Sequence, residues 1–127
     1  GVVVSEGCVD IYNPKVLRAT MGSIFRVPVV SVPNVLEAIA FFKKHGLNVY
    51  AAHLEGSKNY FDLDMRSNTV LIIGNEANGI SGRTAANTDI LVKIPMKEGV
   101  ESLNASVAAS ILMYECVRQK INKSHRP

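Results

Sequence analysis

The chain has 127 residues and a net charge of +3, with 47% hydrophobic and 20% charged residues. This composition excludes a disordered chain, and the length predicts a single domain, residues 1–127, whose core needs no disulfides. No segment reaches the roughly 18 uninterrupted apolar residues of a membrane-spanning helix. We therefore expect a cytoplasmic protein, whose mild positive charge is compatible with a nucleic-acid partner.

Short apolar runs alternate with helical patterns along the chain, as in the βαβ units of a mainly parallel sheet. Residues 2–5 form the first predicted strand. Asn13 and Pro14 are suited to be the N-cap and first position of a short helix, predicted over 15–21. The stretch 24–30 is expected to be extended, at a sheet edge or in a connection, because a proline interrupts it.

The clearest helix runs from Pro33 to His45. Asn34 can cap its first turn, and Glu37 lies where the acid of a capping box reaches back. Gly46 is expected to end the helix in a left-handed conformation.

The rest of the chain alternates in the same way between strands and helices. Residues 48–52, 69–73 and 89–94 read as strands, and their continuous apolar character is typical of strands covered on both faces. Residues 56–66 are expected to form a loop with one helical turn. The last helix is predicted over 101–122.

Cysteines and histidines show no catalytic or metal-binding spacing. Cys8 and Cys116 are far apart in sequence, and we expect buried free thiols in a reducing compartment. His45, His53 and His125 form no ligand set with each other or with the cysteines, so no metal is expected.

Four segments resemble a known enzyme family. They are LIIGNEANGIS (residues 71–81), IPM (94–96), ESLNASVA (101–108) and the upstream run 5–22. The first three resemble motifs 2 and 3 of the SpoU family of RNA ribose methyltransferases, in the SPOUT (α/β-knot) superfamily. The match covers nearly the whole chain, in the family's order and spacing.

This resemblance implies an α/β fold, with a mainly parallel sheet flanked by helices and a deep trefoil knot near its C-terminal end. It implies a homodimer that binds S-adenosylmethionine in the knot and methylates ribose 2′-hydroxyls of rRNA or tRNA. The implied cofactor contacts are Leu54, Gly74, Asn75, Glu76, Gly79, Ile94, Met96, Leu103 and Asn104. Glu76, Ser102 and Asn104 match the family's catalytic polar positions.

Each of these polar residues also has a purely structural interpretation. Ser102 and Asn104 are suited to cap the last helix, and Glu76 to accept hydrogen bonds from the amides that follow it. Arg18 and Arg26 are candidates for RNA phosphate contacts or for solvated salt bridges. Arg118, in a basic C-terminal segment, is a third candidate for RNA contact, or part of a solvated helix end.

One family feature is not found within these residues. The family's first motif supplies an asparagine and an arginine ahead of the strand at 2–5, and no residue here clearly replaces that arginine. A ribose hydroxyl is a poor nucleophile and needs such a partner. We therefore expect a piece truncated at its N-terminus, and the alternative function is a non-catalytic cofactor-binding or dimerisation module of the same fold.

Overall fold

The computed structural model describes residues 1–75, 77–99 and 102–124. The chain divides into two compact units, Gly1–Ala38 and Ile39–Pro127. The boundary falls inside one helix, α2. That residues 1–127 form a single domain remains a prediction.

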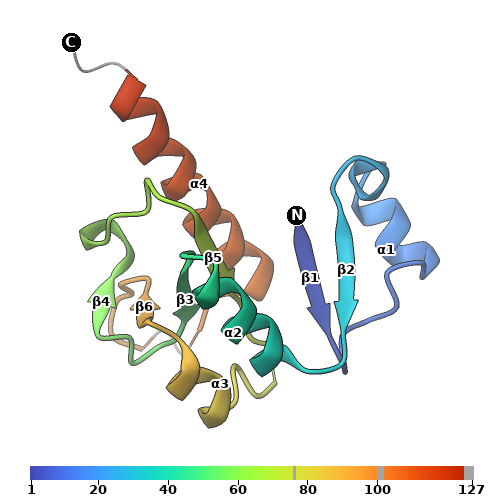
Figure 1. Cartoon of the computed structure of the whole chain (residues 1–127), viewed down its shortest axis with the longest axis horizontal. Coiled ribbons are helices and arrows are strands. Elements are labelled where there is room, and N and C mark those ends of the chain that lie inside the picture. Colours follow the sequence, from blue (N-terminus) through green and yellow to red (C-terminus); the bar gives the residue numbers. More distant parts are fainter. Residues whose placement is uncertain (76, 100–101, 125–127) are drawn as a thin grey trace. The chain divides into compact units, whose positions relative to one another are not determined.

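The first unit is built around a two-stranded parallel sheet. Its elements are β1 (Val2–Ser5), α1 (Pro14–Ala19), the 3₁₀ helix η1 (Ser23–Phe25) and β2 (Val29–Val32). Val2 pairs with Val29, and the register continues to Ser5 and Val32. Parallel pairing requires a crossover connection, which α1 and η1 supply (Figure 1).

Local sequence signals explain where α1 begins. The Asn13 Oδ1 accepts a hydrogen bond of 2.9 Å from the Lys15 amide, and Pro14 occupies the first helical position. Both predictions for this cap are confirmed. The helix is shorter than predicted, since it ends at Ala19 and Met21 adopts a left-handed φ of 47°.

The prediction of an extended segment over 24–30 is wrong at its beginning. Ile24 and Phe25 belong to η1, and the strand starts only at Val29, directly after Pro28. The proline has no amide hydrogen to donate, but its carbonyl accepts from the Val2 amide at 2.8 Å. The proline therefore marks the start of the strand rather than an interruption within it.

The second unit contains a four-stranded, all-parallel sheet in the order β4-β6-β3-β5. Its elements are α2 (Val35–Lys44), which begins in the first unit, β3 (Asn48–Ala52), β4 (Lys58–Asn59), the 3₁₀ helix η2 (Tyr60–Asp62), β5 (Thr69–Ile72), α3 (Gly82–Asn87), β6 (Ile90–Lys93) and α4 (Ala105–Ser124). The prediction of a mainly parallel α/β fold is confirmed. The strands form two separate sheets rather than one.

Both ends of α2 follow their sequence signals. The Asn34 Oδ1 accepts from the Leu36 amide, and its amide nitrogen donates to the Glu37 carboxylate at 3.0 Å. Glu37 therefore contacts the capping side chain rather than its backbone. Gly46 ends the helix with φ 74°, as predicted.

The core of this unit lies between the sheet and α4. Tyr50, Val92 and Leu112 are buried together with two residues that follow η2, Leu63 and Met65. Because side chains alternate along a strand, Val49 and Ala51 are buried on the opposite face of β3. The sheet is thus covered on both faces, as its apolar strands predicted.

Three elements differ from the sequence prediction. The helix α3 was not expected, although Ser81 caps it by accepting from the Thr84 amide at 3.1 Å. The predicted loop over 56–66 contains the short strand β4 before its helical turn, η2. The last helix begins at Ala105 rather than Glu101, which lies outside the described residues.

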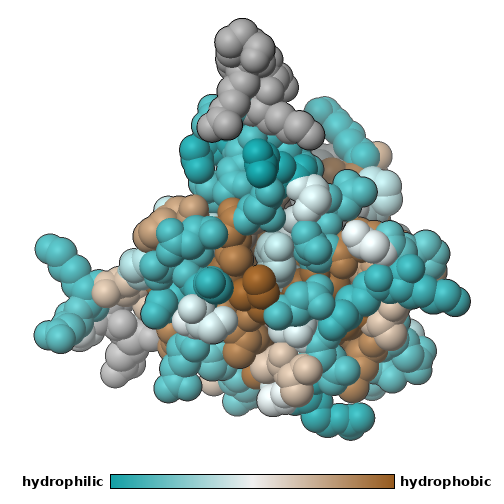
Figure 2. Space-filling view, turned by 60° about the vertical axis from the view of Figure 1, so that its left-hand side comes forward, coloured by the Kyte–Doolittle hydropathy of each residue, from teal (hydrophilic) through white to brown (hydrophobic). Residues whose placement is uncertain are grey.

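The surface carries exposed apolar side chains, but the helices of the described residues do not have the character of membrane spans. Figure 2 shows apolar surface, in brown, exposed between hydrophilic side chains on the side that carries β4 and α3 in Figure 1. Within the described ranges, no helix has the length and apolar character needed to cross a membrane.

Candidate functional site

The ends of three neighbouring strands bring several predicted site residues to one edge of the sheet. β6, β3 and β5 are adjacent and parallel, so their carboxyl ends meet at the same edge. Leu54 follows β3, Gly74 follows β5 and Ile94 follows β6. Ligands of open parallel sheets bind outside this edge.

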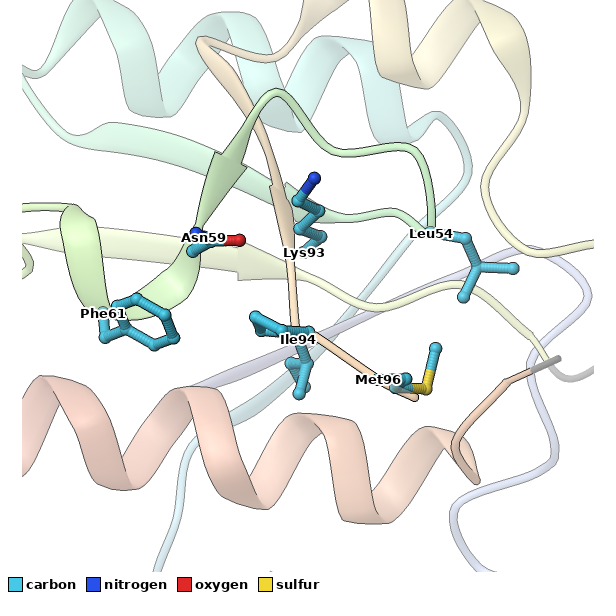
Figure 3. Close-up of a pocket in the computed structure, with 7 residues that line it drawn as sticks. Leu54, Asn59, Phe61, Lys93, Ile94 and Met96 are labelled. Carbon is cyan, nitrogen blue, oxygen red and sulfur yellow. The ribbon is translucent and has the colours of Figure 1, made fainter. Parts of the chain in front are cut away.

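A pocket of about 550 Å³ opens at the β4–β6 side of this edge (Figure 3). Its lining consists of Leu54, Asn59, Phe61, Lys93, Ile94, Pro95 and Met96. Five of these side chains are apolar, and such pockets typically hold small organic ligands. Leu54, Ile94 and Met96 are three of the predicted cofactor contacts.

Gly56 allows the loop after β3 to lie directly against β6. The Gly56 amide donates to the His53 carbonyl at 3.1 Å, and the His53 amide donates to the Val92 carbonyl at 2.9 Å. A Cβ at Gly56 would lie 2.6 Å from the backbone nitrogen of Lys93 and 2.7 Å from the carbonyl carbon of Val92. No side chain fits there, so glycine is required for the approach that brings Leu54 beside β6.

The loop after β5 is closed by Asn75. Its backbone forms an antiparallel bridge with Gly79, and its Oδ1 accepts from the amides of Ala77 and Asn78 at 3.0 and 2.7 Å. Gly79 adopts a φ of 62°, and a Cβ on Gly74 would lie 2.2 Å from the Gly79 carbonyl carbon. The loop amides are therefore satisfied by Asn75, the role considered for Glu76, which lies outside the described residues.

Asn104 is the N-cap of α4. Its Oδ1 accepts from the Ser106 amide at 2.9 Å, and its backbone carbonyl accepts from the Ala108 amide at 3.0 Å. Its amide nitrogen has no hydrogen-bond partner among the described residues. The oxygen thus serves the helix, while the nitrogen is available to a ligand.

The other predicted site residues are divided between the two units. Ser102 is exposed and Leu103 half-buried just ahead of α4. Arg18 and Arg26 are exposed in the first unit, on α1 and directly after η1. Arg118 lies on α4, where its Nε and Nη2 donate to the Glu115 carboxylate at 2.7 Å.

The structure therefore brings Leu54, Ile94 and Met96 to one pocket. The pocket lining does not include Gly74, Asn75, Gly79, Leu103 or Asn104. Sequence reasoning missed Asn59, Phe61 and Lys93. No local signal marks them, because only the pairing of β4 with β6 brings them to the pocket.

Cys8 corrects the expectation of two buried thiols. Both cysteines are free, but Cys8 is exposed in the loop after β1. Cys116 is half-buried on α4, with its Sγ 3.7 Å from the Met65 Sδ. Burial raises the pKa of the Cys116 thiol, so it is a poor nucleophile at neutral pH.

Two carboxylates stabilise the unit that contains the pocket. Asp89 accepts from the Lys43 ammonium at 2.9 Å and from the Val49 amide at 2.8 Å, joining α2 to the start of β3. The hydrogen bond from Lys43 is the main reason why the pKa of Asp89 is lowered. The pKa of Glu115 is lowered chiefly by its hydrogen bond from Arg118, against an opposing effect of burial.

Comparison with known proteins supplies the family. A family model described as the SpoU rRNA Methylase family matches residues 1–114. The chain belongs to this family. The resemblance of its motifs to SpoU proteins is thereby confirmed.

Individual SpoU relatives agree with this assignment. The chain is 35% identical to the 23S rRNA (guanosine-2'-O-)-methyltransferase RlmB of Xanthomonas axonopodis pv. citri, over 94% of this chain and 48% of the relative. It is also 35% identical to a 23S rRNA (uridine(2479)-2'-O)-methyltransferase of Streptomyces viridochromogenes, over 96% of this chain and 44% of the relative. The chain thus spans about half the length of these SpoU relatives.

Solved SpoU structures share the fold. The methyltransferase AviRb of Streptomyces viridochromogenes, in complex with AdoMet, superposes with a TM-score of 0.89 at 35% identity, covering 95% of this chain and 48% of that chain. A TrmH/SpoU tRNA modifying enzyme of A. aeolicus superposes with a TM-score of 0.83 at 32% identity, covering 97% and 64%.

Proposed function

We propose that the protein containing this chain transfers a methyl group from S-adenosylmethionine to a ribose 2′-hydroxyl of rRNA or tRNA. The observation that carries this proposal is the pocket at the strand ends, lined by Leu54, Ile94 and Met96, in a chain of the SpoU family. Its relatives are named for 2'-O-methylation of 23S rRNA, and one solved neighbour contains AdoMet.

The pocket fits the apolar part of this cofactor. Its volume of about 550 Å³ is in the range of small-molecule sites, and the residues after β6 offer Ile94, Pro95 and Met96 as an apolar wall. When bound, the cofactor supplies a methyl group on a positively charged sulfur. The chain contributes chiefly binding and orientation, because an in-line transfer depends on the geometry of the two reacting atoms.

Backbone groups of the neighbouring loops are proposed to complete the site. Asn75 and Gly79 exchange two backbone hydrogen bonds and so hold the two ends of the loop after β5 together. Asn104 is proposed to donate its amide hydrogens to the cofactor or the ribose, and Ser102 to lie beside it. The proposed trefoil knot would hold these loops together, and Arg18, Arg26 and Arg118 remain candidates for RNA phosphate contacts.

The test is calorimetry of the full-length protein with S-adenosylhomocysteine, followed by transfer of labelled methyl groups to rRNA and tRNA. Binding together with a methylated ribose, resistant to alkaline cleavage at that position, supports the proposal. Binding without transfer to either RNA favours the alternative, a non-catalytic module of this fold. Absence of binding contradicts both.

We further propose that the protein is a homodimer through α4. Five apolar side chains on this helix are exposed: Val107, Met113, Tyr114, Val117 and Ile121. Val107, Tyr114 and Ile121 repeat every seven residues and so lie along one side of the helix. Exposed apolar surface of this kind marks interaction sites. A monomeric mass in light scattering of the full-length protein would contradict the dimer.

A further inference from the structure

The pocket contains a charged side chain to which neither the sequence motifs nor the family assignment gives a role. Lys93 is the last residue of β6, and Asn59 is its partner on β4 in the parallel register. Paired residues of neighbouring strands project to the same face of a sheet. Figure 3 shows Lys93 extending from β6 between Asn59 and Leu54, with Ile94 and Met96 toward α4.

The electrostatic character of this pocket is positive. Among the described residues that line it, Lys93 carries the one charge, and the others are apolar or, like Asn59, neutral. Lys93 makes no ion pair with any carboxylate of the described residues. Asp62, the acid beside Phe61, accepts a hydrogen bond from the Asn59 side-chain nitrogen Nδ2 at 3.0 Å instead.

An ammonium group without a counterion among the described residues, in a pocket with both apolar and polar surface, favours a ligand with an anionic group. The adenine and ribose of S-adenosylmethionine are neutral, and its sulfonium and amino groups are positive. Its carboxylate is the one group that gains from a nearby ammonium, and charge-assisted hydrogen bonds of this type are strong. An RNA phosphate is a second anion, but the pocket that Lys93 lines is also lined by Leu54, Ile94 and Met96, three predicted cofactor contacts.

We infer that Lys93 binds the carboxylate of the cofactor's amino-acid moiety and thereby selects for cofactors that carry this moiety. The inference rests on the proposed function, because it requires the pocket to hold the cofactor. Lys93 is then a positioning residue, which fixes the amino-acid end of the ligand while the apolar wall holds the rest.

The experiment compares two ligands in the full-length protein by calorimetry. S-adenosylhomocysteine carries the carboxylate, and 5′-methylthioadenosine lacks the whole amino-acid moiety. Lys93→Met keeps the length and apolar stem of the side chain but removes its charge. We expect this change to weaken S-adenosylhomocysteine binding by about fivefold or more and methylthioadenosine binding by less than twofold.

The matched control is Lys97→Met, which removes an exposed charge four residues along that does not line the pocket. It should change neither affinity, and Lys93→Arg should retain more affinity for S-adenosylhomocysteine than Lys93→Met does. Methylthioadenosine binding by Lys93→Met shows that its pocket is folded.

Several results would overturn the inference. Equal losses for the two ligands would mean general damage to the pocket, and no loss for either would mean that Lys93 does not contact the carboxylate. Weaker RNA binding with unchanged S-adenosylhomocysteine binding would assign Lys93 to a phosphate. If the unmodified protein binds neither ligand, the proposed function itself fails.

Discussion

At the scale of single residues, two glycines determine how closely backbone segments pack at this edge of the sheet. Gly56 and Gly74 both lie where a Cβ would meet backbone atoms of another segment at less than 3 Å. Neither has a positive φ, so an unusual backbone conformation does not explain the need for glycine. Glycine is needed because two backbone segments of the chain approach each other closely. Backbone atoms cannot move aside as the end of a flexible side chain can.

We predict that Gly56→Ala destabilises the protein by at least about 2 kcal/mol, because the new methyl group must displace β6. Gly82→Ala is the matched control. Gly82 opens α3, has open space around its Cβ position and no positive φ, so alanine should be neutral or stabilising by up to about 1 kcal/mol. Chemical denaturation of both variants measures the difference, and equal stabilities would refute the argument.

Asn104 combines a structural and a proposed functional role in one carboxamide. Asn104→Asp keeps the oxygen that caps α4 but removes the amide donor, so stability should remain within about 0.5 kcal/mol. Asn104→Ala removes both and should cost about 0.5–2 kcal/mol. If the amide contacts the cofactor or ribose, both variants lower methyl transfer at least tenfold, or about 1.4 kcal/mol of barrier.

The comparison of these two variants separates the roles, because melting curves report the cap and transfer rates report the donor. Full transfer activity in Asn104→Asp would leave this residue with the helix cap alone.

At the scale of elements, α4 is fastened to the loop after η2 by one side chain. The Gln119 amide nitrogen donates to the Leu63 carbonyl at 2.9 Å, and its Oε1 accepts from the Met65 amide at 2.8 Å. The Leu63 and Met65 side chains of this segment are buried in the core. Gln119 gives the segment's backbone the hydrogen bonds that a neighbouring strand would otherwise supply. This explains how a segment without helix or strand can be part of the core.

We predict that Gln119→Ala lowers the stability by about 1–3 kcal/mol, because it leaves a backbone donor and an acceptor without partners. Asn122→Ala, on an exposed position of the same helix, should change it by less than about 0.5 kcal/mol. Thermal melts of both variants test this, and hydrogen exchange at the Met65 amide should accelerate in Gln119→Ala alone.

At the scale of the whole molecule, acid stability depends on carboxylates whose hydrogen-bond partners hold their pKa values down. The pKa values of Asp89 and Glu115 are lower in the folded chain than their ordinary values. A group with a lowered folded pKa contributes stability above its unfolded pKa and loses it as the pH falls through the folded one. The protein should therefore lose stability below about pH 4.5.

Glu115→Gln should remove this contribution at one site. At pH 7 we expect a loss of about 1 kcal/mol, reduced by the exposure of Arg118, and at pH 3 the variant and the unmodified protein should approach each other. Glu98→Gln, at an exposed loop position, is the control. Urea denaturation at both pH values measures the effect, and a difference independent of pH would contradict the assignment to Glu115.

The sequence by itself determined the elements whose signals are local. The Asn13–Pro14 cap, the Asn34 cap and the Gly46 terminus follow from neighbouring residues, and the strand Asn48–Ala52 has the predicted bounds. The family was equally accessible, because its motifs are continuous segments. The loop around Gly74 and the IPM segment followed from those motifs as candidate site segments.

Only the tertiary structure decided what depends on pairing between segments far apart in the chain. The strand β4 exists because Lys58 and Asn59 pair with Val92 and Lys93. A strand of two residues is too short for a sequence pattern to reveal its propensity. The same pairing brings Asn59 and Lys93 to the pocket. Gly56 likewise matters because the backbone of β6, 35 to 37 residues later in the chain, packs directly against it. Local chemistry thus fixed the helix ends and strands, while contacts across the sheet determined which side chains share the pocket.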